Sequence, residues 1–374
     1  MKALRNLVDN VKPTFTEGGK LGFLASLFDA IETFLFVPNT TTKKGAHVRD
    51  CNDMKRTMFF VVLALIPAFL FGCYNTGSQV GLEGFAALMY GLVRVLPMLA
   101  VSYVVGLGIE VIYAQIRKEE VAEGYFVTGF LIPMIMPVST PLWMVALGVA
   151  FAVIFGKEVF GGTGMNIFNP ALVARAFVFF AFTPQMSGEK VWFSDWKMMG
   201  ATDATTGATA LEQLATTGDM QWSVMDAFLG FIPGSFGETS TLCILIGAAI
   251  LLYAGVASWR TMLSVFVGGL AMGYLFQAVG LTEYPAYYHL VVGGFAFGAV
   301  FMATDPVTSA RTECGKYIYG FLIGVVAVMV RVLNPGYPEG MMLAILLMNL
   351  FAPLVDYVFV QKNINMRAKR ATKK

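Results

Sequence analysis

Residues 58–71 read MFFVVLALIPAFLF, a run without a single charged side chain. Comparable apolar runs recur along the chain and begin near Met58, Leu92, Tyr125, Leu142, Phe168, Leu242, Met262, Tyr287, Tyr317 and Met341. Most of them are long enough to approach one bilayer crossing. The sequence therefore predicts an all-α polytopic membrane protein with about ten transmembrane helices.

The composition agrees with a membrane protein and excludes other classes. Of 374 residues, 57% are hydrophobic and 13% are charged, whereas about 25% are charged in soluble domains. The net charge is only +2, and the basic residues form no single patch, which argues against nucleic-acid binding. The cysteines are far apart and form no C-x-x-C pattern, so we expect no metal site; they are Cys51, Cys73, Cys243 and Cys314.

Two of the apolar runs, the third and the fifth, are short. They are flanked by prolines, at positions Pro133, Pro137, Pro141 and Pro170. Because proline interrupts helices, this pattern favours broken or re-entrant helices around a functional centre. Two segments of the chain are similar, NPALVAR at 169–175 and DPVTSAR at 305–311. This similarity indicates two duplicated halves, residues 57–183 and 241–361. The similarity leaves open whether these halves are inverted or parallel.

The charged segments predict the topology. Lysine and arginine are concentrated before the first run and after the last, in residues 1–56 and 362–374, so we expect both ends in the cytoplasm. The loop 184–240 is acidic and should lie outside. Apolar residues at helical spacing within 21–35 predict an amphipathic helix, either on the membrane surface or docked on a partner. The first residues lack the apolar core of a cleavable signal peptide.

The outside loop contains the run DATTGATAL, residues 203–211. One interpretation is an ordinary flexible loop of small residues. The other is a modification site, because a threonine hydroxyl beside small residues is accessible to an enzyme and Gly207 lets the backbone bend. The residues alone leave both interpretations open.

Five long strings carry a resemblance to a known family. They are HVRDCNDMKR (47–56), EGYFVTGFLIPMIMPVSTPLW (123–143), GGTGMNIFNPALVARAFVFFAF (161–182), FMATDPVTSARTECGKYIYG (301–320) and APLVDYVFVQKNI (352–364). The chain resembles the NqrB/RnfD family, which comprises the NqrB subunit of the sodium-translocating NADH:quinone reductase and the RnfD subunit of the Rnf-type ferredoxin:NAD oxidoreductase. The closer resemblance, to NqrB, implies an electron-relay subunit of a bacterial inner-membrane complex that oxidises NADH, reduces quinone and pumps Na⁺.

The resemblance also implies cofactors. In that family the last threonine of a D-x-x-[ST]-G-A-T motif carries FMN through a phosphoester, attached by a flavin transferase. That threonine is Thr209 here, and the rest of the motif comprises Asp203, Thr206, Gly207 and Ala208. Thr206 stands where many relatives have serine.

A second, non-covalent flavin is implied by the same resemblance. The family holds riboflavin near the place of Asn166 and Asn169, which we carry over as its ligands. The glycines of the turn 161–164 would let a broken helix open there, and the turn is no nucleotide loop because no strand precedes it. The alternative is that both asparagines cap broken helices.

The resemblance also implies a quinone site, and carboxylates within apolar runs suggest an ion pathway. The family's quinone site implies Gly106, which matches a family glycine, and Leu107, which stands where some relatives have a second glycine. Gly106, like the pair Gly294 and Gly298, also permits close helix packing. Among carboxylates in apolar runs we assign the ion pathway to Glu110 and Asp356. Glu158 and Asp305 are expected to be paired, because Lys157 and Arg311 respectively lie close in sequence.

The resemblance implies partner subunits, since the chain has no NADH-binding or iron–sulfur motif. They are a subunit with NADH and FAD sites, a second subunit with covalent FMN and small membrane subunits, so the chain alone should not oxidise NADH. Two alternatives are an Rnf-type subunit and a non-redox secondary transporter. The polar segment 1–56 and the HVRD string disfavour the Rnf type.

Overall fold

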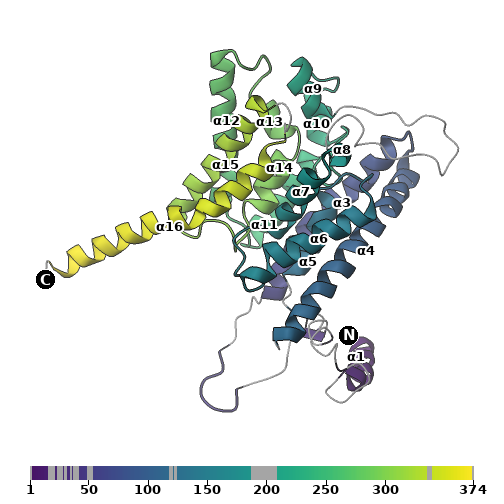
Figure 1. Cartoon of the computed structure of the whole chain (residues 1–374), viewed down its shortest axis with the longest axis vertical. Coiled ribbons are helices and arrows are strands. Elements are labelled where there is room, and N and C mark those ends of the chain that lie inside the picture. Colours follow the sequence, from purple (N-terminus) through teal and green to yellow (C-terminus); the bar gives the residue numbers. More distant parts are fainter. Residues whose placement is uncertain are drawn as a thin grey trace.

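The structure is a computed structural model that describes residues 2–15, 42–48, 54–117, 124–186, 209–334 and 339–372, together with residues 22, 28, 32–33, 36 and 121. Within these residues the chain forms helices and no strand. Figure 1 shows a bundle with the short helices α9 and α10 at one end and the N-terminal helix α1 at the other. We call the first of these the Thr209 end, because Thr209 is the cap residue of α9.

Six helices of the described chain are long and apolar enough to cross a membrane. They are α3 (Met54–Ser78), α4 (Gly84–Arg117), α6 (Leu142–Gly156) with its 3-10 extension η2 (Glu158–Phe160), α12 (Trp259–Val279), α15 (Glu313–Leu333) and α16 (Met341–Ala371). The prediction of an all-α multi-pass membrane protein is therefore confirmed.

Shorter elements stand at the other four predicted crossings. They are α5 (Tyr125–Met134), α7 (Pro170–Ala181) and α11 (Thr241–Tyr253). The fourth is an interrupted series of α13 (Tyr288–Val291), α14 (Phe295–Phe297) and the short π-helix η4 (Gly298–Met302). The third and fifth segments, α5 and α7, are short as predicted, with 10 and 12 residues. The total of ten crossings, the duplication and the cytoplasmic position of the termini stay predictions.

The two similar segments, residues 169–175 and 305–311, fold differently. Residues 169–175 form the cap and first turns of α7, where Pro170 occupies the first helical position that proline favours. Residues 305–311 form turns that precede α15. The two strings nevertheless meet, because the Asn169 amide nitrogen lies 3.3 Å from a carboxylate oxygen of Asp305. This contact joins the two parts of the bundle on either side of the outside loop.

Close helix contact depends on glycine where α12 meets α15. A Cβ atom on Gly268 would lie 2.2 Å from the carbonyl oxygen of Phe321, and one on Gly324 would lie 2.2 Å from that of Val265. Such backbone approach is typical of membrane helices, which gain mainly from van der Waals packing. Gly294 and Gly298 allow close packing too, because Cβ atoms there would clash with Glu238 and Met341.

A small second core holds the loop elements at the Thr209 end. α9 (Ala210–Thr217) and α10 (Val224–Leu229) bury Ala210, Leu214 and Ala227 against Val292 and Ile232. The segment that begins at Thr209 is therefore fixed to the region between α13 and α14.

Both chain ends carry helices beyond the bundle. α1 (Lys2–Phe15) was not predicted, and its Arg5 and Asp9 form an ion pair of 3.1 Å one turn apart. α16 continues past the bundle and projects away from it (Figure 1). The amphipathic helix predicted within 21–35 lies almost entirely outside the described residues.

Candidate functional site

A cavity lies where the ends of several helices meet, opposite the Thr209 end. The empty space within it, including its open mouth, is about 790 Å³. Its walls come from the beginnings of α3, α5 and α7, the turn 161–164, the end of α11 and residues 304–307. The lining residues that matter below are Lys157, Thr163, Asn166, Asn169 and Asp305, with apolar walls from Val61, Leu131 and Phe301.

The glycine turn shapes one side of this cavity. Gly161, Gly162 and Gly164 have φ angles of 119°, 91° and 92°, which residues with a side chain rarely adopt. The turn reverses the chain after η2 and delivers Asn166 and then α7 to the cavity wall. The glycines therefore open the broken helix, as the sequence predicted.

Asn166 and Asn169 both line the cavity and both stabilise local backbone. The Asn166 side chain accepts a hydrogen bond from the Gly164 amide (3.3 Å) and donates one to the Phe168 carbonyl (3.0 Å). Asn169 caps α7, accepting from Ala171 (3.0 Å) and Leu172 (3.4 Å). Asn166 thus caps no helix but stabilises the turn before α7, and the capping alternative is correct for Asn169. It does not exclude ligand binding, because each amide nitrogen has a second N–H.

Asp305 faces the cavity from the second half. Its carboxylate accepts hydrogen bonds from the Val307 amide (3.0 Å), the Thr308 hydroxyl (3.0 Å) and Asn169. These contacts of Asp305 do not include the nearby Arg311, with which sequence proximity had suggested an ion pair. Three donors compensate the charge of the Asp305 carboxylate without a cation.

A buried ion pair adjoins the cavity. Lys157 and Glu110 form a direct contact, and the side chain of each is 3% exposed. The Lys157 ammonium lies 5.9 Å from the centre of the Tyr125 ring. The pairing of Lys157 with Glu158 that sequence proximity predicted is wrong, because Glu158 pairs with Arg117 at 3.5 Å. Glu110 on α4 reaches Lys157 because α4 packs against α6, which ends at that lysine.

Gly106 and Leu107 do not line the cavity. A Cβ atom on Gly106 would lie 1.9 Å from the ring of Tyr125, whose hydroxyl donates to the Ser102 carbonyl (2.8 Å). Leu107 packs against the main core. The packing alternative therefore holds for Gly106, and a quinone site at these positions stays a prediction.

Asp356 fastens α16 to the beginning of α15. Its carboxylate accepts hydrogen bonds from the amides of Arg311 (2.7 Å) and Thr312 (2.9 Å) and from the Thr312 hydroxyl. No contact in the described part of the chain joins Asp356 to Glu110. The structure thus gives Asp356 a capping role and leaves the ion pathway untested.

Thr209 is the N-cap residue of α9. Its side-chain oxygen accepts a hydrogen bond from the Glu212 amide at 3.2 Å, and the side chain is partly exposed. Asp203, Thr206, Gly207 and Ala208, the other members of the predicted attachment motif, lie outside the described residues. The hydroxyl is accessible and stands at the positive end of a helix.

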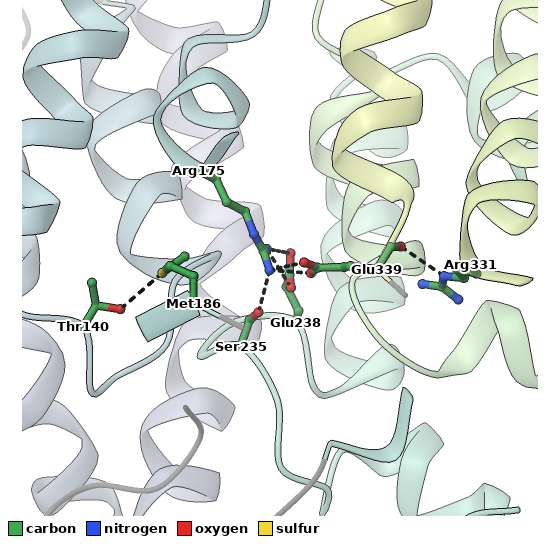
Figure 2. Close-up of polar contacts among 7 residues, drawn as sticks. All are labelled: Thr140, Arg175, Met186, Ser235, Glu238, Arg331 and Glu339. Atoms are coloured by element: carbon green, nitrogen blue, oxygen red, sulfur yellow. Dashed lines mark hydrogen bonds and ion pairs between the residues drawn. The ribbon is translucent and has the colours of Figure 1, made fainter. Parts of the chain in front are cut away.

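Sequence reasoning missed a buried ion cluster between the two halves. In Figure 2 the Arg175 side chain, from α7, reaches between the carboxylates of Glu238 and Glu339. The two Arg175–Glu238 contacts are 3.1 and 3.2 Å, and Ser235 also accepts from the guanidinium at 3.4 Å. Arg331 on α15 donates to the Glu339 carbonyl (3.1 Å). One guanidinium thus holds two loops that precede α11 and α16.

This cluster predicts a pH dependence. Burial, with help from the Glu238 carboxylate, raises the pKa of Glu339 to about 7 against the influence of Arg175. Because this pKa lies above its value in the unfolded chain, the folded state holds the proton more tightly. Stability should therefore fall as the pH rises from about 4.5 to about 7. Thermal unfolding midpoints between pH 5 and 8 should decrease less in Glu339→Gln, and equal slopes in both proteins would contradict this account.

Among the described residues, no group of three or more histidine, cysteine, aspartate or glutamate side chains could hold a metal ion. Cys73, Cys243 and Cys314 are free, and Cys51 lies outside the described residues.

Known proteins resemble this chain over nearly its whole length. The family model described as NQR2, RnfD, RnfE matches residues 41–365. The chain is 48% identical to the NqrB subunit of the Na(+)-translocating NADH-quinone reductase of Chromohalobacter salexigens, over 98% of this chain and 96% of that protein. The same subunits of Pseudomonas paraeruginosa and Klebsiella pneumoniae are 47% and 45% identical, each over 98% of this chain and 99% of the relative. The chain belongs to the NQR2, RnfD, RnfE family.

Proposed function

We propose that this protein is the NqrB subunit of a respiratory complex that passes electrons from NADH to quinone and moves Na⁺ across the bacterial inner membrane. The observation that carries the proposal is the match of nearly the whole chain to relatives named as that subunit. Both termini would then face the cytoplasm. The partners would be a subunit with NADH and FAD sites, a second subunit with covalent FMN, and small membrane subunits.

Covalent FMN on Thr209 is supported by the position of that residue. A phosphoester there would place a phosphate at the N-terminus of α9, where backbone N–H groups and the helix dipole favour negative charge. The ester oxygen could still accept the Glu212 hydrogen bond. The buried contacts of Ala210 and Leu214 would hold the attached group close to the bundle. A flavin transferase must reach this loop from outside.

Riboflavin suits the cavity bounded by Asn166 and Asn169. Their unused N–H groups and the Thr163 hydroxyl are donors for the heteroatoms of an isoalloxazine ring, while Val61, Leu131 and Phe301 offer apolar walls. A bound flavin would supply reversible electron transfer at this place. The residues of the chain bind and orient it and keep water from its apolar face.

Quinone reduction is assigned to α4, and ion movement to carboxylates on α4 and α16. Gly106 and Leu107 lie on α4 one turn from Glu110, whose ion pair with Lys157 borders the cavity. A quinone near these residues would therefore lie close to the flavin. Glu110 and Asp356 remain the proposed carboxylates of the ion pathway, because acidic groups within membrane helices are usually functional.

The decisive test is attachment of flavin to Thr209. The chain is produced in a host with its flavin transferase and run on a denaturing gel, which removes non-covalent flavin. The wild-type band should fluoresce, and Thr209→Ala should lose the fluorescence completely, because the ester oxygen is gone.

Thr217→Ala provides the matched control. Thr217 lies on the same helix, and its hydroxyl donates to the Gln213 carbonyl at 2.7 Å, so fluorescence should persist. A dark wild-type band, with the transferase active on another substrate, would overturn covalent FMN and favour a non-redox transporter. A fluorescent subunit whose assembled complex reduces NAD with ferredoxin, and not quinone with NADH, would identify the Rnf-type alternative.

A further inference from the structure

We infer that the last part of α16, residues 357–371, is a membrane-surface helix that binds anionic phospholipids. Its apolar face contacts the acyl chains, and its basic side chains contact the phosphates of the headgroups. This role is independent of electron transfer and of any bound flavin, so it goes beyond the proposed function.

Helices α12 and α15 locate one boundary of the bilayer. Each has 21 residues, which corresponds to a length of about 31 Å and matches the hydrocarbon layer. The two helices run in the same direction. A Cβ atom on Gly320 would meet the Thr261 carbonyl, and one on Gly324, a turn later, would meet the Val265 carbonyl. Their starts therefore lie side by side at one face of the membrane.

Aromatic and basic side chains gather at these two helix starts. Trp259 and Tyr317 are 49% and 39% exposed, and their rings meet edge to face with centres 6.2 Å apart. The Arg260 guanidinium lies 5.2 Å from the centre of the Trp259 ring. Tryptophan and tyrosine are enriched where a membrane meets water. The boundary of the bilayer therefore passes through the starts of α12 and α15.

Helix α16 reaches the same boundary at Asp356. The Asp356 carboxylate accepts hydrogen bonds from the amides of Arg311 and Thr312, directly before α15 begins. The helix nevertheless continues without a break to Ala371. Residues 357–371 form a segment about 22 Å long, which lies at or beyond the membrane surface. Figure 1 shows that this end of α16 leaves the bundle sideways.

The segment carries one apolar stripe. Five apolar residues follow one another at intervals of three or four, which places them on one face of the helix. They are the exposed residues Tyr357, Val360, Ile364, Ala368 and Ala371. Towards the bundle the stripe continues with Leu354 and Leu350, which are 59% and 54% exposed on the membrane-spanning part of α16. A face that already contacts acyl chains thus extends into the segment.

The charge of the segment is positive throughout. Its charged residues are Lys362, Arg367, Lys369 and Arg370, and the sequence has no acidic residue between 357 and 374. All four are exposed, and none takes part in an ion pair within the described chain. An apolar stripe combined with cations is typical of helices that lie on anionic membranes. Each cation near such a surface strengthens binding about fivefold.

An acidic protein surface is the other occupant that four cations could attract. The stripe favours lipid, because it is continuous with leucines on a membrane-spanning helix. A protein in the aqueous phase would contact the segment without any need for this continuity.

Spin labels measure where the segment lies. The full chain, with its four native cysteines replaced by alanine, carries a label on Ile364→Cys or, as matched control, on Asn365→Cys, which lies on another face. In vesicles of phosphatidylcholine and phosphatidylglycerol, the label at 364 should collide mainly with oxygen dissolved in the lipid. The label at 365 should collide mainly with a water-soluble nickel complex. In phosphatidylcholine alone, the label at 364 should become more accessible to the nickel complex.

Two charge variants test the role of the cations. In Lys362→Gln/Arg367→Gln/Lys369→Gln/Arg370→Gln, the ratio of nickel to oxygen collisions at position 364 should rise by about tenfold or more in the anionic vesicles. The matched control exchanges lysine and arginine at the same positions and keeps every charge, so its ratio should equal that of the wild type. Because all four side chains are exposed, both variants should fold.

Each contrary outcome has its own meaning. Equal accessibility of positions 364 and 365 in the anionic vesicles would overturn the surface helix. Burial of position 364 that persists in the glutamine variant would overturn the role of anionic lipid. Burial that appears only when partner subunits are present would show that a protein covers the stripe, and the inference would be wrong. None of these results bears on flavin at Thr209, which the gel assay tests separately.

Discussion

Replacing Arg175 by methionine is expected to lower the thermal unfolding midpoint by about 5 °C or more at pH 8. Arg175 is the guanidinium shared by Glu238 and Glu339, and its side chain is 6% exposed. Methionine keeps much of the apolar stem but leaves the Glu238 and Glu339 carboxylates facing each other without the guanidinium that they share. Breaking a buried pair in this way typically costs about 3 to 5 kcal/mol.

The pH dependence of the variant distinguishes lost charge pairing from lost packing. At pH 5 the Glu339 carboxyl, whose pKa is already raised by burial, should be protonated in the variant, so most of the loss should disappear. A steric defect would persist at both pH values. Tryptophan fluorescence during heating in detergent measures both midpoints.

Arg260→Met is the control for this substitution. Arg260 pairs with Glu313 at the surface, where the two side chains are 35% and 57% exposed. Such exposed pairs contribute about 0 to 1 kcal/mol, so its midpoint should change little. Equal losses in the two variants would show that the cluster does not hold the loops before α11 and α16.

The cluster also illustrates what the sequence could not predict. Arg175 meets partners that are 63 and 164 residues away, and its own helix is only 12 residues long. No local pattern brings those positions together. An arginine within an apolar run is nevertheless costly unless paired, and that signal alone could have marked Arg175 as a residue with a buried partner.

The bundle was more predictable than its polar contacts. Uninterrupted apolar runs such as 58–71 must be helical in a membrane, since every backbone group needs an internal partner. The prolines around α5 and α7 indicated correctly that these segments are short. The ion pairs were predicted from residues that are close in sequence. For Lys157 this prediction was wrong, because Lys157 lies at the end of α6 and reaches Glu110 on the adjacent α4, not Glu158.

The candidate site was predicted in part. Asn166 and Asn169 do line one cavity with Asp305, because the glycine turn and the cap of α7 place them there. Asp356 proved to cap the start of α15, a role that a carboxylate in the middle of α16 does not reveal without the fold. The covalent flavin and the quinone remain proposals that rest on the family.

Gly106→Ala is expected to impair both stability and quinone reduction, whereas Gly108→Ala on the same helix should change neither. An alanine Cβ at Gly106 would lie 1.9 Å from the Tyr125 ring, while a Cβ at Gly108 meets nothing within 4 Å. Tyr125 is fully buried, so it must shift and lose its hydrogen bond to Ser102. Overpacking of this kind costs about 1 to 3 kcal/mol.

The effect should reach the cavity through Tyr125, whose ring lies beside the Lys157 ammonium. In the assembled complex, Gly106→Ala should therefore lower the rate of quinone reduction and the retention of non-covalent flavin together. Tyr125→Leu removes the ring, so the double variant Gly106→Ala/Tyr125→Leu should lose less than the sum of the single losses. Strictly additive losses would mean that the alanine acts elsewhere, for instance directly on quinone at α4, and Tyr125 would then have no part in transmitting it.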